Sequence, residues 1–181
     1  MFNGKAITVC GPVAPEMLGS MMMHDHLHVD FYDWEKQQLI VEEKPCSEER
    51  RRYLLDDAVP LLKECRNHGM GAFVDPTFPP TRAWPDVYRE VSERSGMHII
   101  LCTGFYREIE TGTYFVKSPD HAVWPYVRKT PVEELTEMCV REITQGIHGT
   151  DIHAGAIKLG SSAREMTETE IMFRKKLTRS Q

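Results

Sequence analysis

The stretch Met21-Met22-Met23-His24-Asp25-His26-Leu27-His28 sets histidines at alternating positions directly after an apolar run. In an extended strand, alternate side chains lie on the same face, so His24 and His26 are expected to point the same way. Neutral imidazole is the commonest metal ligand in proteins, and two convergent rings could share one ion. His28 has the same parity but falls one step past the strand. Taken alone, the pattern fits two metal ligands and ordinary polar residues at a strand end equally well.

Length and composition are those of a soluble globular protein. The chain has 181 residues, of which 41% are hydrophobic and 27% charged, and this length suits one domain rather than two. The net charge of −5 gives no reason to expect a nucleic-acid or membrane partner. Because no signal-like segment and no apolar run of about 18 residues occurs, we expect a cytoplasmic protein. The 5 cysteines are scattered and form no C-x-x-C pair, which argues against disulfides and thiolate zinc sites.

Short apolar runs alternate with helical patterns along most of the chain. After a hairpin or strand-plus-turn within residues 5–20, strands are expected at 18–24, 71–75, 97–103 and 153–159. Helices are expected from Ser47 until Gly69, over 81–95, from Thr130 to Ile147 and from Thr167. A repeated strand-then-helix order predicts parallel strands with right-handed crossovers, and therefore an α/β fold.

Several residues mark where these helices begin and how they continue. Ser47 is expected to cap the first helix, and Pro60 is expected to kink it. A hydroxyl cap followed by Pro131 at the first helical position is expected to start the third. Thr167 and Glu170 form a capping-box pattern at the start of a last helix that we expect to be barely formed.

Two segments are too long and irregular to be simple connections. Residues 29–46 hold aromatic residues among acidic and amide residues, and residues 107–129 hold aromatic residues and prolines. We expect the first to be a loop over a site and the second to be a partial lid. Simple packing also explains the aromatic residues of the first segment.

Five short motifs follow one another in a fixed order. They are Leu18-Gly19, His24-Asp25-His26-Leu27, Val74-Asp75-Pro76-Thr77, His98-Ile99 continued by Thr103-Gly104-Phe105-Tyr106, and Ala154-Gly155-Ala156-Ile157-Lys158. In this order the motifs resemble the phosphotriesterase-like branch of the amidohydrolase superfamily, from residue 5 to about residue 173. An ordered set of motifs is far more specific than any one of them.

The resemblance implies a (β/α)₈ TIM barrel with a binuclear metal centre at the C-terminal ends of its strands. It assigns His24 and His26 to the more buried ion, and a carbamylated Lys158 to the bridge between two ions and to catalysis. It implies hydrolysis of an ester bond, in a phosphoester or a lactone, by a hydroxide that the metal ions activate. Oxygen and nitrogen ligands suit zinc, manganese, cobalt or iron, and we expect zinc. Tyr106 takes the place of an aromatic residue that lines the leaving-group pocket.

Each of these residues also has an ordinary structural explanation. A lysine at a strand end is more often an exposed residue than a ligand, so Lys158 gains its role only from the motif around it. Aromatic residues such as Tyr106 pack more often than they bind. Asp75 fits a partner that orients a metal ligand and a cap at a helix entry equally well. The remaining histidines match no ligand position of the family: His28, His68, His98, His121, His148 and His153.

The chain is shorter than the barrel that its motifs imply. A (β/α)₈ barrel needs about 250 residues, so residues 1–181 are expected to form one partial domain, the N-terminal half of the barrel after a short β-hairpin. The family's further ligands, histidines of the fifth and sixth strands and an aspartate of the eighth, have no counterpart here. We therefore expect the truncated chain to be inactive without a missing C-terminal half.

Two other interpretations stay open. The chain could be an inactive fragment or pseudoenzyme that self-associates into a homo-oligomer, because a half barrel leaves strand edges uncovered. It could also be an open-sheet module that binds a ligand without hydrolysis, although the absence of a glycine-rich phosphate loop weakens this interpretation. If the chain belongs to a hydrolase, its partner is a small-molecule ester, lactone or phosphoester.

Overall fold

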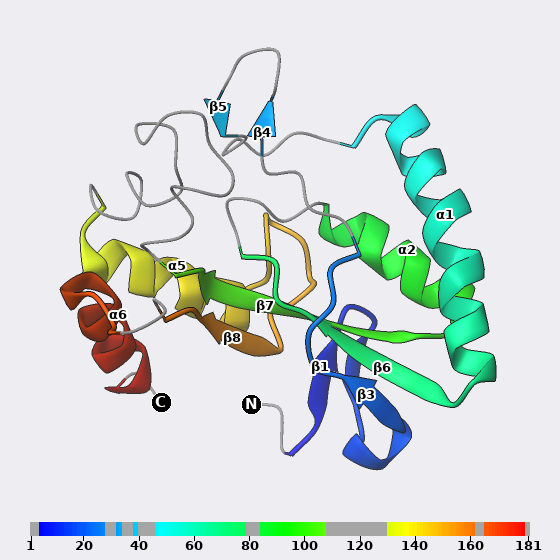
Figure 1. The fold of residues 1–181 in the computed structure, drawn as a ribbon, viewed down its shortest axis with the longest axis horizontal. Coiled ribbons are helices and arrows are strands. Elements are labelled where there is room, and N and C mark those ends of the chain that lie inside the picture. Colours follow the sequence, from blue (N-terminus) through cyan, green and yellow to red (C-terminus); the bar gives the residue numbers. More distant parts are fainter. Residues whose placement is uncertain are drawn as a thin grey trace.

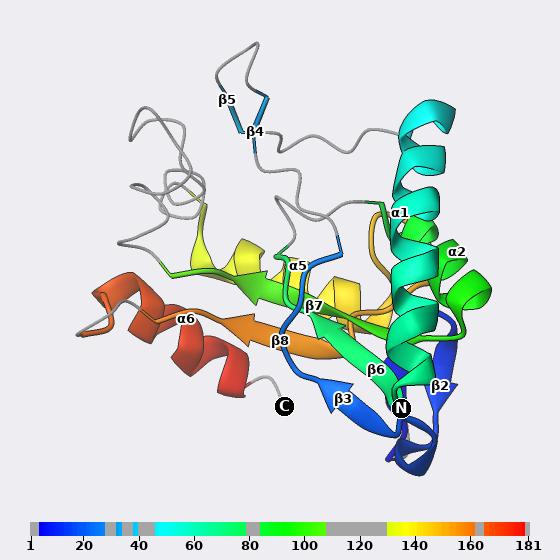
Figure 2. The same ribbon diagram turned by 45° about the vertical axis from the view of Figure 1, so that its right-hand side comes forward.

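Four parallel strands in the order β3-β6-β7-β8 form the central sheet. Their bounds are Ser20–Met22 for β3, Met70–Asp75 for β6, His98–Phe105 for β7 and Ala156–Leu159 for β8. In this computed structural model the strands lie side by side and their arrowheads point the same way (Figure 2). The structure describes residues 4–27, 32–33, 38–39, 46–78, 84–107, 130–161 and 165–179.

A helix follows each strand of the sheet. The helices are α1 (Glu48–Asn67), α2 (Pro85–Ser95), α5 (Val132–Thr144) and α6 (Glu168–Arg179). α1 and α2 lie on one side of the molecule in Figure 1, and α5 and α6 on the other. The predicted alternation of parallel strands and helices is confirmed, and it corresponds to half of a (β/α)₈ barrel. None of the helices in the described part of the chain has the length and apolar character needed to cross a bilayer.

A short antiparallel hairpin precedes the sheet, as predicted. β1 (Ala6–Thr8) pairs with β2 (Gly11–Val13). Directly after β1, the Val9 N–H donates to the carbonyl of Ile99, with an N···O distance of 2.9 Å. The hairpin is therefore tied to the start of β7, at the opposite end of the strands from their C-terminal ends. A 3₁₀ helix, Pro15–Met17, connects the hairpin to β3.

The two faces of the sheet have different neighbours, because side chains alternate along each strand. Ile99 and Leu101 belong to the main hydrophobic core, together with residues of α1 and α2 such as Leu62. Ile100 and Cys102 belong to a smaller cluster on the opposite face. That face corresponds to the interior of a barrel, because barrel helices cover the outside.

Two of the predicted helix starts have the expected caps. The Ser47 hydroxyl accepts a hydrogen bond from the Arg50 N–H, with an N···O distance of 3.2 Å, and α1 then runs unbroken through Pro60. At α6 the capping box is formed: the Thr167 hydroxyl accepts from the Glu170 N–H, and the Glu170 carboxylate accepts from the Thr167 N–H. Side chains at these two positions therefore determine where the helices begin.

Other expected boundaries were wrong. Pro131 is the N-cap of α5 rather than its first helical residue, and Ile147 lies beyond the end of this helix. α6 is a helix of 12 residues, so it is not barely formed. The fourth strand begins later than residue 153, because the Ala154 N–H donates to the carbonyl of Glu142 instead of joining the sheet.

Most of the two long predicted loops lies outside the described residues, so the predicted site-covering loop and lid stay predictions. Within the first segment, β4 (Tyr32–Asp33) pairs antiparallel with β5 (Gln38–Leu39). The start of the second segment is described only at Arg107.

Candidate metal centre

His24 and His26 lie beyond the end of β3, not within it. β3 ends at Met22, so the expectation that one strand would place both imidazoles on one face is wrong. The two rings nevertheless converge: their Nε2 atoms are 3.2 Å apart, and the ring planes are inclined at 78°. Both residues are exposed, so the pair lies at the surface of the described structure.

Hydrogen bonds to the end of β6 hold the segment that follows β3. The Asp25 N–H donates to a backbone carbonyl of β6 at 3.2 Å, and the Leu27 N–H donates to Oδ2 of Asp75 at 3.1 Å. Between these two contacts, Nδ1 of His26 lies 2.6 Å from Oγ1 of Thr77. These contacts with β6, rather than the alternation of a strand, place the imidazoles together.

Asp75 is fully buried at the end of β6. Its carboxylate accepts from the N–H groups of Leu27 and Thr77, and Oδ1 lies 3.4 Å from Nδ1 of His26. Burial acts to raise the pKa of this carboxyl, but hydrogen bonds from His26, Thr77 and Leu27 outweigh it and hold the pKa below its ordinary value. Asp75 does not cap α2, whose N-cap is Trp84. The sequence left two roles open for Asp75, a partner that orients a metal ligand and a helix cap. The structure shows a contact between Asp75 and His26, the predicted ligand.

Lys158 lies on β8 directly beside Gly104 of β7. Gly104 is two positions beyond Cys102, whose side chain lies on the interior face, so alternation directs Lys158 to the same face. The side chain is half-buried. Burial lowers the pKa of its ammonium group; Cys102 opposes this shift and Arg107 adds to it. Lys158 therefore loses its proton more readily than an exposed lysine.

The pKa of His24 reflects the nearness of the three predicted ligands. It is lowered first by burial, then by the charges of Lys158 and His26, while Asp75 and Asp25 act in the opposite direction. A lowered pKa keeps the imidazole neutral, which is the form that binds metal ions. The structure therefore brings the predicted ligands into one electrostatic environment.

The distance between the two imidazoles fits a shared metal ion. Two nitrogen ligands at about 2.0–2.1 Å from a tetrahedral ion lie roughly 3.3–3.4 Å apart, and the two Nε2 atoms are 3.2 Å apart. Lys158 fits as a ligand only after losing its proton, because an ammonium group has no lone pair. Among the described residues, no cluster of three or more His, Cys, Asp or Glu side chains is placed to hold an ion. The described centre is thus the imidazole pair with Lys158 near it.

Tyr106 follows β7 and lies beside Lys158. The Lys158 Nζ is 5.6 Å from the centre of the Tyr106 ring, and the guanidinium carbon of Arg107 is 5.2 Å from it. The ring also stacks on Phe78, with centroids 6.1 Å apart and an interplanar angle of 22°. Tyr106 therefore packs on one neighbour and meets the predicted catalytic lysine with the same ring.

Thr77 belongs to the centre although no sequence pattern predicted a role for it there. It is only 1% exposed, and its hydroxyl makes the 2.6 Å contact with His26. In the sequence, the feature that could have indicated this role is the hydroxyl residue two positions after Asp75, within the Val74-Asp75-Pro76-Thr77 motif. Nothing local in that motif indicates that Thr77 would contact a residue so far away in the sequence.

The other histidines lie elsewhere. His68 and His153 interact with a glutamate of α1 and a backbone carbonyl of α5, both at 3.0 Å. His98 is the first residue of β7, and His148 lies in the turn after α5 with a φ of 51°. The two positions outside the described residues are His28 and His121.

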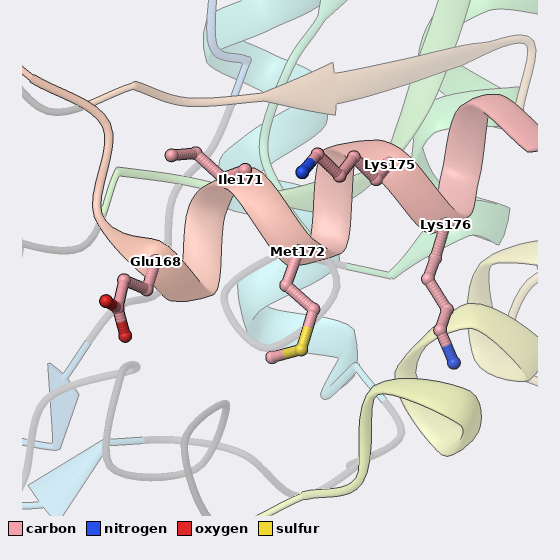
Figure 3. Close-up of a pocket in the computed structure, with 5 residues that line it drawn as sticks. All are labelled: Glu168, Ile171, Met172, Lys175 and Lys176. Atoms are coloured by element: carbon pink, nitrogen blue, oxygen red, sulfur yellow. The ribbon is translucent and has the colours of Figure 1, made fainter.

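Two hollows of the described surface lie away from this centre. The described residues that line one of them belong to α6, namely Glu168, Ile171, Met172, Lys175 and Lys176 (Figure 3). The other lies between the hairpin and α2, where Arg89 donates to Asp151 at 2.8 Å. Neither hollow contains a predicted ligand, so the convergent imidazoles remain the candidate site.

The sequence of this chain matches the pattern described as the Phosphotriesterase family over residues 4–178. The chain belongs to the phosphotriesterase family. Two proteins with similar sequences are given as examples. The phosphotriesterase-related protein of Nematostella vectensis is 25% identical over 180 residues, which cover 87% of this chain and 48% of that protein. The N-acetyltaurine hydrolase of Tetraodon nigroviridis is 27% identical over 188 residues, which cover 93% and 50%.

Solved structures of phosphotriesterase-family proteins have the same fold over this region. The organophosphorus hydrolase of Deinococcus radiodurans superposes with a TM-score of 0.75 at 27% identity, covering 97% of this chain and 50% of that chain. A variant of the PTE-like lactonase from the same organism gives a TM-score of 0.77 at 28% identity, covering 96% and 50%. This chain therefore spans about half the length of the relatives that it matches.

Proposed function

We propose that this chain contributes the N-terminal ligands of a metal-dependent hydrolase of the phosphotriesterase/lactonase type. In this proposal His24 and His26 would hold one divalent ion, expected to be zinc, and a carbamylated Lys158 would supply further oxygen donors to the metal centre. The observation that supports the proposal most directly is the convergence of the two imidazole nitrogens at 3.2 Å. Membership of a hydrolase family supports the reaction class.

Lys158 enters the proposal through its amine. Because burial lowers its pKa, a larger fraction of the side chain is neutral than for an exposed lysine. The neutral amine can form a bond to the carbon of carbon dioxide and release a proton, which yields an anionic carbamate with two oxygen donors. The modification replaces a cation that repels metal ions with a group that can bind them.

Tyr106 is the proposed substrate-binding residue. Its ring lies beside Lys158 and stacks on Phe78, so it can form one wall of a pocket. Metal ions held at this centre would supply Lewis acidity toward a phosphoryl or carbonyl group and would activate water. The proposed substrates are small esters, lactones and phosphoesters, in keeping with the names of the Deinococcus relatives. Because some relatives are named N-acetyltaurine hydrolase, an N-acyl amide is also a compound to be tested.

We further propose that residues 1–181 form one partial domain and that turnover needs groups outside it. The described residues provide two imidazoles and Lys158 but no larger cluster of ligands. The second candidate is a non-catalytic chain that self-associates, because β3 and β8 each have one neighbouring strand in the described sheet. The cysteines are free thiols, which supports a reducing, cytoplasmic location.

Metal content tests the ligand assignment. The purified chain is loaded with zinc in bicarbonate buffer as wild type, His24→Ala and Lys158→Ala, desalted, and analysed for metal. We expect wild type to retain zinc and both variants to retain at least about tenfold less, because each loses a proposed ligand. His68→Ala is the matched control, since His68 is an exposed histidine of the α1 end. Equal zinc in all four proteins, or none in wild type, refutes the assignment.

Turnover and size test the partial-domain proposal. The same preparations are assayed with a lactone, a phosphotriester and N-acetyltaurine, and their mass is measured by size-exclusion chromatography with light scattering. We expect zinc binding without hydrolysis. Hydrolysis by a monomer would show that the described half is sufficient. A stable dimer without zinc would favour the self-associating chain instead.

A further inference from the structure

Three consecutive residues after β3 contact the end of β6. The Asp25 N–H reaches a β6 carbonyl at 3.2 Å, the His26 ring reaches Thr77 at 2.6 Å, and the Leu27 N–H reaches Asp75 at 3.1 Å. The backbone on both sides of His26 is therefore fixed, and its ring is fixed as well. An exposed histidine in an ordinary loop has no such set of contacts.

The groups that make these contacts are themselves buried. Asp75 is 0% exposed and Thr77 is 1% exposed. The Asp75 carboxylate accepts from the Thr77 N–H at 2.9 Å, which holds the threonine in place. The carboxylate also accepts a hydrogen bond from the backbone N–H of Leu27. A buried anion with these donors around it gives the hydroxyl of Thr77 a fixed position from which to meet the imidazole.

The hydroxyl of Thr77 can accept from Nδ1 of His26 or donate to it. A hydroxyl that donates to the carboxylate of Asp75, which only accepts, favours the first arrangement. When Nδ1 carries the proton, it donates to the Thr77 hydroxyl oxygen, and the hydroxyl can in turn donate toward Asp75. Nε2 then has a free lone pair, and this is the atom that lies 3.2 Å from Nε2 of His24. Protonation at Nε2 instead would point an N–H at the neighbouring imidazole and block the ligand.

We propose that Thr77 is a positioning residue that holds His26 in its Nδ1–H form, and that Asp75 positions Thr77 and the backbone around His26. This inference rests on the proposed role of His26 as a metal ligand. Partners of this kind, which bind the far nitrogen of a ligating histidine, change metal affinity by about 10–100-fold. The preorganisation exists before any ion arrives, because all of its groups belong to the protein.

Zinc affinity of the full chain gives the first test, measured by competition with a chromophoric chelator. Thr77→Val keeps the shape of the side chain but removes the hydroxyl, and it is expected to weaken zinc binding by about 10–100-fold. Thr77→Ser restores the hydroxyl and is expected to restore most of the affinity. Unchanged affinity in Thr77→Val overturns the proposal.

Thr103→Val is the matched control. Thr103 is also buried, and its hydroxyl has no hydrogen-bond partner among the described residues. Thr103→Val therefore makes the same chemical change as Thr77→Val at a buried position of the sheet that has no contact with His26. A loss of zinc affinity in Thr103→Val equal to that in Thr77→Val would mean that any buried Thr→Val change acts through general loosening, which overturns the proposal.

The tautomer of His26 gives a second test that needs no metal. The ring nitrogens are observed by NMR in the metal-free chain with ¹⁵N-labelled histidine, and His26 is assigned by its loss in His26→Gln. We expect Nδ1–H in wild type and Thr77→Ser, and a mixture of tautomers in Thr77→Val. Wild type with Nε2–H overturns the positioning role. If the tautomers behave as expected but no protein binds zinc, the proposed metal function fails while the positioning role stands.

Discussion

The two sides of the candidate metal centre are held in place by different means. On the β3–β6 side, His26 is fixed by hydrogen bonds to buried groups, with Thr77 2.6 Å from its ring. On the β7–β8 side, Lys158 is placed by strand register, and its Nζ meets the ring of Tyr106 at 5.6 Å. Hydrogen bonds are directional and orient a side chain, whereas register places only the backbone. Hydrogen bonds within the protein therefore orient the His26 imidazole. For the Lys158 amine, strand register fixes the position of the backbone, and no comparable hydrogen bond is found among the described contacts.

The largest effect among these predictions is expected on the β7–β8 side, where the backbone of β8 lies close to Gly104. Gly104 has a φ of +101°, and a Cβ added there would lie 2.1 Å from the carbonyl oxygen of Lys158. We expect Gly104→Ala to lower the free energy of unfolding by about 3–5 kcal/mol, because the clash is with paired backbone that cannot move aside. Urea denaturation measures the change.

Gly149→Ala separates the clash from the cost of the backbone conformation. Gly149 has a φ of +72°, but a Cβ added there meets no atom within 4 Å. We expect this variant to lose only about 1–2 kcal/mol, the cost of a left-handed conformation. If both glycine variants lost the same free energy of unfolding, the close approach of β8 to Gly104 would not be the cause of the loss in Gly104→Ala.

A smaller effect is expected on the β3–β6 side from removal of the buried carboxylate. Asp75→Leu would leave the N–H groups of Leu27 and Thr77 without their acceptor, which should cost about 2–3 kcal/mol of unfolding free energy. Asp75→Asn keeps one acceptor oxygen and should lose less. Asp151→Asn, at a largely exposed carboxylate paired with Arg89, is expected to lower the unfolding free energy by less than about 1 kcal/mol. Wild-type stability in Asp75→Leu would contradict the hydrogen-bonded description of this side.

Acid titration checks the same carboxylate. The folded-state pKa of Asp75 lies below its ordinary value of 3.8, so the unfolded chain takes up the proton first as the pH falls. The contribution of Asp75 is fully present above that ordinary value and is lost as the pH falls through the folded-state pKa. Urea denaturation from pH 5 to about pH 2 should therefore show a steeper loss in wild type than in Asp75→Asn. Parallel curves would show that Asp75 is not stabilised in its ionised form.

The smallest effect is expected at Tyr106, where the contacts are made by a ring. Tyr106→Leu removes the stacking on Phe78 and the contact with Lys158, which should cost about 1 kcal/mol of unfolding free energy. Tyr106→Phe keeps the ring and should unfold like wild type. Thermal and urea unfolding of both variants measure this. A larger loss in Tyr106→Phe than in Tyr106→Leu would mean that the hydroxyl, not the ring, matters on this side.

The repeated strand–helix order was predictable because hydrophobic periodicity and caps act over a few residues. Ser47 and the pair Thr167 and Glu170 are bonded as their local patterns predicted. The boundaries that were wrong depend on partners distant in the sequence. The start of β8 is one such case, since Ala154 bonds to a carbonyl of α5 instead of to the sheet. α6 also ran longer than expected, and it packs Phe173 into a buried cluster with residues of α5.

By itself, the sequence determined the alternation of strands and helices, the parallel sheet that follows from it, and the order of motifs typical of the phosphotriesterase family. Only the tertiary structure decided how the site is assembled. His24 and His26 lie outside the strand that was expected to align them, and their convergence depends on contacts such as that between His26 and Thr77, which are 51 positions apart. The physical reason is that periodicity and capping are local properties of the chain, whereas a directed hydrogen bond between two strand ends exists only after the sheet has brought those ends together.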